Sequence, residues 1–199
     1  SKVYYGVDLW GVVDKELNPF IKAGMTLYGE VVGYIPESDK AIQKNYDYGC
    51  IPGQHENYIY RITITSEDNV VYEWPMLQVQ QWCKKNGLKA VPLLYYGKVG
   101  QLFAKLYMIH YKVTGNSIPE YNSDIFLELL TKEFLEKKCT KENFDVFCNN
   151  DVWDEGIVLR VENLDIECYK LKSFNFKCQE SKQLDSGETN IEDNQEVEA

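Results

Sequence analysis

One acidic and two basic side chains near the end of the chain have the types and spacing that suit a phosphate site. Glu155 precedes Gly156 and the apolar run 157–159, so a carboxylate stands at a glycine turn that leads into a predicted strand. Lys170 and Lys172 follow on a second predicted strand, and their spacing places both ammonium groups on one face. Because a carboxylate can hold a divalent metal and two cations can hold phosphate oxygens, the pattern predicts a nucleotide phosphate site.

Each of these segments also has a simpler interpretation. Glu155 could be a solvated turn residue, and alternating lysines are a common way for an exposed edge strand to avoid pairing with another chain. Lys177 continues the basic stretch and is interpreted as a surface or polynucleotide-facing residue. His55 in a polar loop and His110 near a helix end have no evident cysteine or serine partner, so we interpret both as surface or packing residues.

Two predicted strands further up the chain carry residues suited to binding a nucleoside. Glu30 lies among apolar and aromatic neighbours in 27–34, where burying an ionised carboxylate without partners would be costly. Tyr60 could stack on a base, or could equally be a core aromatic of its strand. Tyr58 is on the same strand face and is the rival for stacking, whereas Arg61 is predicted to face the other way as a structural residue.

In this order, the four segments resemble motifs of the covalent nucleotidyltransferases, which include ATP-dependent polynucleotide ligases and mRNA capping enzymes. The stretches YGEVVGY (28–34), YIYRI (58–62) and EGIVLR (155–160) are most similar to the RNA ligases. The resemblance implies ATP as the AMP donor, Mg²⁺ as the cofactor and RNA ends as partners. It assigns the ribose to Glu30, the adenine to Tyr60, the metal to Glu155, and the α-phosphate to Lys170 and Lys172.

The reaction that the resemblance implies is ATP-dependent joining of RNA ends, as in RNA repair. A lysine attacks ATP to form a lysyl-adenylate, the adenylate passes to an RNA 5′-phosphate, and a 3′-hydroxyl then displaces AMP. The family's nucleophile segment, Lys-x-(Asp/Asn/His)-Gly, has no match here, and Lys2 is wrongly spaced from both Gly6 and Glu30. We therefore expect the chain to start downstream of the nucleophile and to be inactive alone in self-adenylylation. The alternatives are a non-catalytic nucleotide- or RNA-binding relative and a DNA ligase of the same superfamily.

The predicted fold is α+β, with antiparallel sheets of a ligase-type, ATP-grasp-like core, flanking helices and the nucleotide between the sheets. We expect one nucleotidyltransferase domain, 1–178, truncated at its N-terminus, and an acidic disordered tail, 179–199. Strands are predicted at 27–33, 58–65, 70–74, 91–95, 156–161 and 168–172, and helices at 75–86, 101–111 and 124–138. Ser123 is the predicted cap of the last helix, and Phe174 and Phe176 are predicted to cover the end of the core.

Composition bears on the partners and the cellular location that we expect for the protein. The net charge is −10, but residues from 180 onward contribute −6, so the rest carries only −4 and any contact with RNA must be a local basic groove. Six cysteines show neither a CxxC pair nor zinc spacing, which favours reduced thiols in the cytoplasm. No apolar run is long enough for a membrane span, and we expect a monomer that does not bind membranes.

Overall fold

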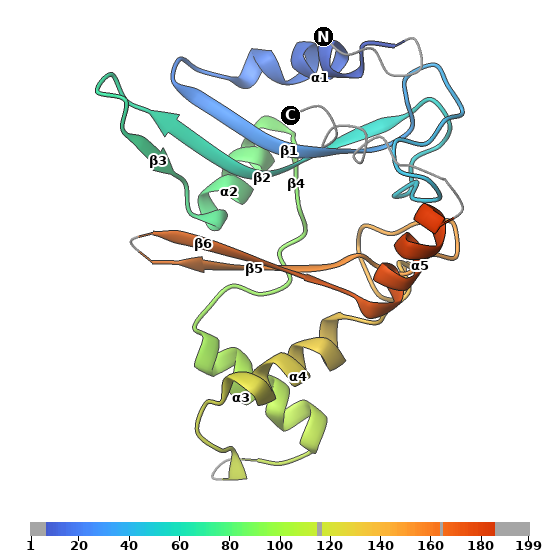
Figure 1. Ribbon diagram of the computed structural model, residues 1–199. Coiled ribbons are helices and arrows are strands. Elements are labelled where there is room, and N and C mark those ends of the chain that lie inside the picture. Colours follow the sequence, from blue (N-terminus) through green and yellow to red (C-terminus); the bar gives the residue numbers. More distant parts are fainter. Residues whose placement is uncertain (1–6, 115–116, 164, 186–199) are drawn as a thin grey trace.

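The computed structural model describes residues 7–114, 117–163 and 165–185, which form the α+β fold predicted from the sequence (Figure 1). In chain order the elements are α1 (Leu9–Leu17), a 3₁₀ turn (Asn18–Phe20), β1 (Met25–Gly33), β2 (His55–Thr65), β3 (Val71–Glu73), α2 (Met76–Asn86), β4 (Lys89–Ala90), α3 (Val99–Tyr111), α4 (Ser123–Phe134), β5 (Gly156–Glu162), β6 (Ile166–Lys172) and α5 (Phe174–Asp185). The strands form two separate sheets, and the site residues predicted from the sequence are divided between them.

The first sheet has the order β1-β2-β3, with antiparallel pairing throughout, and the short β4 adds a parallel pairing to β2. A β-bulge interrupts the first pair, because Tyr28 pairs with Arg61 while Gly29 pairs with Ile59, which leaves Tyr60 without a partner. The extra residue shifts the alternation of β2. Ile59 and Ile62, three residues apart, are therefore both buried in the core that α2 completes.

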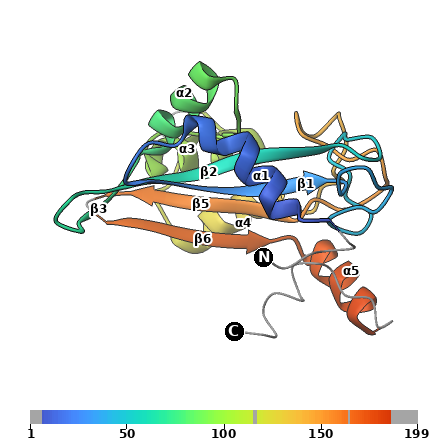
Figure 2. The same cartoon turned by 90° about the horizontal axis from the view of Figure 1, so that it is seen from above.

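The second sheet is the β5–β6 hairpin, which runs along the first sheet in both views (Figures 1 and 2). Alternation gives the hairpin two different faces. Ile157, Leu159 and Leu171 pack on the apolar core of α3 and α4, which lie on the far side of the hairpin in Figure 1. The opposite face carries Val158 and its cross-strand partner Lys170.

Charged hydrogen bonds join the two sheets at the β3 end. The carboxylate of Glu73 accepts from Arg61 Nε at 2.7 Å and from Arg160 Nη1 at 2.7 Å. Arg160 also donates to the carbonyl of Trp74 at 2.8 Å and to Glu162 at 2.9 Å. Since the side chain of Arg160 is only 12% exposed, these charges lie partly out of water, where charge-assisted hydrogen bonds are strongest.

The sheets are also joined at their other end, through two loops. The hydroxyl of Tyr46 donates to the carbonyl of Trp153 at 2.7 Å. The buried carboxylate of Asp47 accepts from the backbone N–H of Asn149 at 2.9 Å and from the side chain of Asn150 at 3.3 Å. The 43–50 loop, which follows β1, is therefore tied to the 136–155 loop, which precedes β5.

Several predicted elements differ from the structure. Residues 91–95 form no strand, and the short β4 lies just before them. Asn122, not Ser123, caps α4 by accepting from Asp124 N and Ile125 N at 3.0 Å each, and α4 ends at Phe134 rather than at 138. Helix α1 falls in a segment with no predicted element.

The end of the chain departs from its prediction as well. Residues 179–185, predicted to begin the disordered tail, continue helix α5, and 186–199 lie outside the described residues. Phe176 is buried as predicted, but Phe174 is 69% exposed. All six cysteines are free thiols, as expected. None of the helices in the described ranges combines the length and apolar character needed to cross a lipid bilayer.

We predict that Glu73→Gln lowers the free energy of unfolding by about 2–3 kcal/mol, because it leaves two guanidinium groups without a shared counter-charge in a partly buried place. Urea unfolding measures this loss. Glu128→Gln is the matched control, since Glu128 pairs with Lys132 on the exposed surface of α4, and it should stay near wild type. Equal effects of the two substitutions would contradict the proposed importance of Glu73.

Candidate functional site

The position of Glu155 is set by the turn that opens the β5–β6 hairpin. Gly156 has φ 139°, and a Cβ there would lie 2.0 Å from the carbonyl oxygen of Leu171, so only glycine allows this close approach. The backbone of Ser173 donates to the carbonyl of Glu155 at 2.8 Å. The main chain on both sides of the carboxylate is therefore fixed against β6.

Three of the charged residues predicted from the sequence come together at the junction of the two sheets. Lys170 Nζ lies 3.8 Å from Glu155 Oε2. Lys170 is the cross-strand partner of Val158 in the hairpin. Both charges affect the pKa of Glu30 on β1. Desolvation raises the pKa of Glu30, the negative charge of Glu155 raises it further, and Lys170 lowers it.

The side chain of Glu30 is exposed to solvent, yet desolvation by neighbouring protein atoms still raises the pKa of its carboxyl. Glu30, Glu155 and Lys170 together supply two carboxylates and one ammonium group. Such a set of charges can bind a cation together with a phosphate.

The other oxygen of Glu155 is held by two residues that the sequence did not single out. Oε1 accepts from Gln43 Nε2 at 2.6 Å and from the hydroxyl of Tyr48 at 3.2 Å. Both residues lie between the predicted strands 27–33 and 58–65, where no element was predicted. No sequence pattern could have identified them, because they lie 112 and 107 residues away from Glu155 along the chain.

Tyr60 is better placed for base stacking than its rival Tyr58. Tyr60 is the bulged residue of β2 and is 40% exposed; partial burial raises its pKa, and the charge of Glu30 acts in the same direction. The ring of Tyr58 is covered by Lys89, whose Nζ lies 5.7 Å from its centroid. Arg61 has the contacts expected of a structural residue, since its guanidinium lies over the ring of Tyr28 and binds Glu73.

Val158 is a second candidate contact for a base, which sequence reasoning missed. It is 60% exposed although it sits in the middle of β5, and it pairs with Lys170 on the face turned away from α3 and α4. An exposed β-branched side chain beside the charged cluster offers the apolar surface that a flat base requires.

Lys172 has a different environment from Lys170. Its Nζ binds both carboxylate oxygens of Glu180 on α5, at 3.1 and 3.2 Å, and lies 5.3 Å from the ring centroid of Phe176. The structure therefore places the ammonium group of Lys170 beside Glu155, whereas that of Lys172 is paired with Glu180 of α5. Lys177 is exposed on the same helix, as predicted for a surface residue.

The donor set fits a magnesium ion. Within the described ranges, no three His, Cys, Asp or Glu side chains form a group that could hold a metal alone. Magnesium in nucleotide sites typically uses one or two carboxylates and takes its other ligands from phosphates and water. Glu155 Oε2, which accepts no hydrogen bond from Gln43 or Tyr48, matches that requirement.

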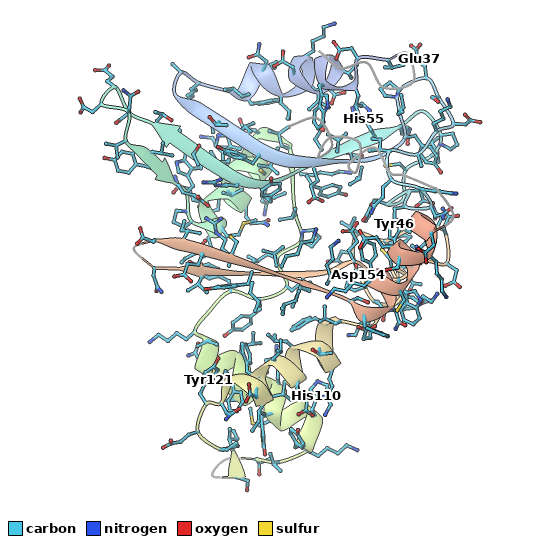
Figure 3. All side chains as sticks on the ribbon, viewed as in Figure 1. Glu37, Tyr46, His55, His110, Tyr121 and Asp154 are labelled. Atoms are coloured by element: carbon cyan, nitrogen blue, oxygen red, sulfur yellow. The ribbon has the colours of Figure 1, made fainter. Side chains whose placement is uncertain are left out.

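Asp154 directly precedes Glu155, whereas the two histidines lie elsewhere, His55 near α1 and His110 on α3 beside α4 (Figure 3). Asp154 and Tyr46 occupy the same end of the molecule, beside α5 (Figure 3). Asp154 accepts from the N–H of Gly156 at 3.1 Å. His55 lies 3.1 Å from Glu16 and His110 lies 2.9 Å from Glu133, which are the packing and surface contacts expected for both histidines.

The chain matches the model of a family described as RNA ligase, over residues 2–177. No curated protein matches it. The matched range contains β1, β2, β5 and β6, the four strands that carry or flank the charged cluster.

We predict that Asp154 makes stability depend on pH in the mildly acidic range. Burial raises the pKa of Asp154 from 3.8 to about 6, and the charge of Glu155 adds to this, against the opposing Gly156 hydrogen bond. Because the folded state holds the proton more tightly than the unfolded state, Asp154 favours folding most below pH 4. That contribution, at most about 3 kcal/mol, is lost as the pH rises to about 6.

Asp154→Asn keeps an oxygen to accept the Gly156 N–H and has no charge to bury. In EDTA, urea unfolding should show the variant near wild type at pH 4 and more stable than wild type at pH 7.5. The same stability difference at both pH values would show that Asp154 does not titrate in this way.

Proposed function

Since the chain belongs to the RNA ligase family, we propose that it serves ATP-dependent joining of RNA 5′-phosphate and 3′-hydroxyl ends. The reaction proceeds through lysyl-adenylate and RNA-adenylate intermediates, with the nucleophilic lysine upstream of this chain in the parent protein. The observation that carries the proposal is the meeting of Glu30, Glu155 and Lys170, which come from two sheets and from distant parts of the sequence. A packing role alone would not require two carboxylates to approach each other.

The residues of the site have separate roles in this proposal. Glu30 accepts hydrogen bonds from the ribose hydroxyls, and the ring of Tyr60 stacks on the adenine. Val158 covers the base from the hairpin side. These contacts orient the nucleoside, which places the triphosphate next to the charges of Glu155 and Lys170.

The charges act on the phosphates. Glu155 Oε2 would hold Mg²⁺, which would neutralise phosphate charge and so ease attack at the α-phosphorus. Lys170 holds a non-bridging oxygen of the α-phosphate and favours the transition state, in which negative charge builds up and shifts toward pyrophosphate. Lys172 assists once its ammonium group leaves Glu180.

We predict that this chain binds ATP in a magnesium-dependent way and that Glu155→Ala removes the magnesium dependence while the thermal midpoint stays near wild type. In the parent protein the same substitution should abolish lysine adenylylation, measured with radiolabelled ATP. Glu167→Ala is the control, because Glu167 lies on the same hairpin and contacts Tyr169 rather than the site.

The outcomes separate the possible functions. If the Glu155→Ala variant is adenylylated as well as the wild type, Glu155 does not belong to the site. Magnesium-dependent ATP binding without adenylylation in the parent protein would indicate a nucleotide-binding relative. Adenylylation followed by joining of DNA but not RNA ends would indicate a DNA ligase.

The lysines give a second prediction. Lys170→Ala and Lys172→Ala should each slow nucleotidyl transfer in the parent enzyme by about tenfold or more, equivalent to at least ~1.4 kcal/mol. Lys177→Ala should have a small effect on adenylylation and a salt-dependent effect on RNA binding. Equal, mild effects of all three substitutions would contradict the phosphate-site assignment.

Glu180 provides a further check on Lys172. If Lys172 reaches the phosphates, Glu180→Gln removes its competitor and should tighten ATP binding several-fold. The same substitution in a Lys172→Ala background should have no such effect. Weaker ATP binding in Glu180→Gln would show instead that Glu180 holds Lys172 in its working position.

A further inference from the structure

Glu155 presents its two carboxylate oxygens to different surroundings. Oε1 accepts from Gln43 Nε2 at 2.6 Å and from the Tyr48 hydroxyl at 3.2 Å, and that hydroxyl also lies 3.3 Å from Gln43 Oε1. Oε2 instead faces Lys170 Nζ at 3.8 Å. The contacts among these three side chains fix the rotation of the carboxylate, and uncharged donors occupy one of its two oxygens.

The backbone of the 43–50 loop is shaped to deliver the Tyr48 hydroxyl. Tyr48 has φ 47° and Gly49 has φ 77°, so a bulky residue adopts the left-handed conformation that glycine favours. Asp47 supports this turn, because its Oδ1 accepts from the N–H of Gly49 at 3.0 Å and from that of Asn149 at 2.9 Å. A less favourable conformation is thus held in place from both sides of the sheet junction.

Packing of the loop does not require the contact between Tyr48 and Glu155. Tyr46 already ties the loop to Trp153 through its hydroxyl, and its ring joins a buried cluster with Cys139, Cys148, Val152 and Phe176. The ring of Tyr48 packs against this cluster too, with its centroid 5.8 Å from that of Tyr46, so the packing of the ring does not depend on its hydroxyl. The hydroxyl of Tyr48 and the side-chain amide of Gln43 bind Glu155, the carboxylate that faces Lys170.

We propose that Gln43 and Tyr48 are positioning residues for Glu155, which occupy Oε1 so that Oε2 alone is presented to magnesium and the nucleotide phosphates. This inference rests on the proposed function. The two residues touch neither substrate nor metal. They act by removing the rotational freedom of the carboxylate and by preventing both of its oxygens from binding one ion.

The test is the effect of a metal on nucleotide binding by this chain. Affinity for ATP is measured by calorimetry in Mn²⁺ and in EDTA, and binding of Mn²⁺ is followed by its electron paramagnetic resonance signal. Gln43→Met and Tyr48→Phe keep the side-chain shapes and remove the donors. Each should weaken Mn²⁺ binding about tenfold, the size typical of residues that hold a metal ligand, while ATP binding in EDTA changes less than about twofold.

Two comparisons isolate the role of Glu155. In a Glu155→Gln background, Gln43→Met and Tyr48→Phe should have no further effect on Mn²⁺ binding, because the ligand they position is gone. Tyr46→Phe and Gln80→Met are matched controls. They remove the hydrogen bonds to the carbonyls of Trp153 and Val91, at 2.7 Å each, and should lower thermal stability without a specific effect on Mn²⁺.

The outcomes distinguish this inference from the proposed function. If Tyr48→Phe behaves like Tyr46→Phe, or if binding in Mn²⁺ and in EDTA falls equally, the loop has a structural role only and the inference is wrong. If the wild-type chain binds ATP equally in Mn²⁺ and in EDTA, the metal role of Glu155 fails first, and the proposed function fails with it. Should Tyr48→Phe not fold, Gln43→Met alone decides.

Discussion

The position of the β5–β6 hairpin against the first sheet depends on the carboxylate of Glu73, which accepts from two guanidinium groups at once. Arg61 comes from β2 and Arg160 from β5, so this single side chain of β3 joins three strands of two sheets. Partial burial strengthens these bonds and also makes them costly to lose. Any tilt of the hairpin at this end would separate charges that have little access to water.

The two ends of the hairpin have different chemistry. At the β3 end, Arg61, Glu73, Arg160 and Glu162 satisfy one another. At the other end, Glu30 and Glu155 repel each other, and Lys170 lies at the longer distance of 3.8 Å from Glu155. A fold under selection for stability alone would neutralise such charges, so their persistence agrees with the proposed role of the cluster in binding a cation and a phosphate.

The sequence predicted the elements whose patterns are local. Runs of β-branched and aromatic residues between turn formers located β1 and β2, and the apolar run after Gly156 and the alternation around Lys170 located β5 and β6. The spacing of Lys170 from Glu155 was sufficient to bring the two together once β5 and β6 paired as a hairpin. Proline before α2 and Gly87 after it marked that helix well, and Gly87 adopts the left-handed conformation typical of a helix end.

The remainder was not predictable from local patterns, for identifiable reasons. Asn122 and Ser123 are both good caps, and only the geometry of the preceding turn selects Asn122. Residues 91–95 are apolar enough for a strand, but after Val91 donates to the carbonyl of Ile59 the pairing with β2 stops at Pro92, which has no N–H to donate. The bulge at Tyr60 depends on two strands in register, and the hold of Gln43 and Tyr48 on Glu155 depends on two loops that meet only in the folded chain.

The distance along the chain between Gln43 and Glu155 has a consequence for the order of folding. Their contact closes a loop of 112 residues. The segments of chain between β1 and β2, and between β5 and β6, are much shorter. Closing a long loop costs entropy that only many later contacts can offset, so local pairs form more easily than the junction between the sheets. A nucleotide that binds at that junction, as proposed, would bind the completed fold alone and would stabilise the entire chain by an amount that grows with its concentration relative to its Kd.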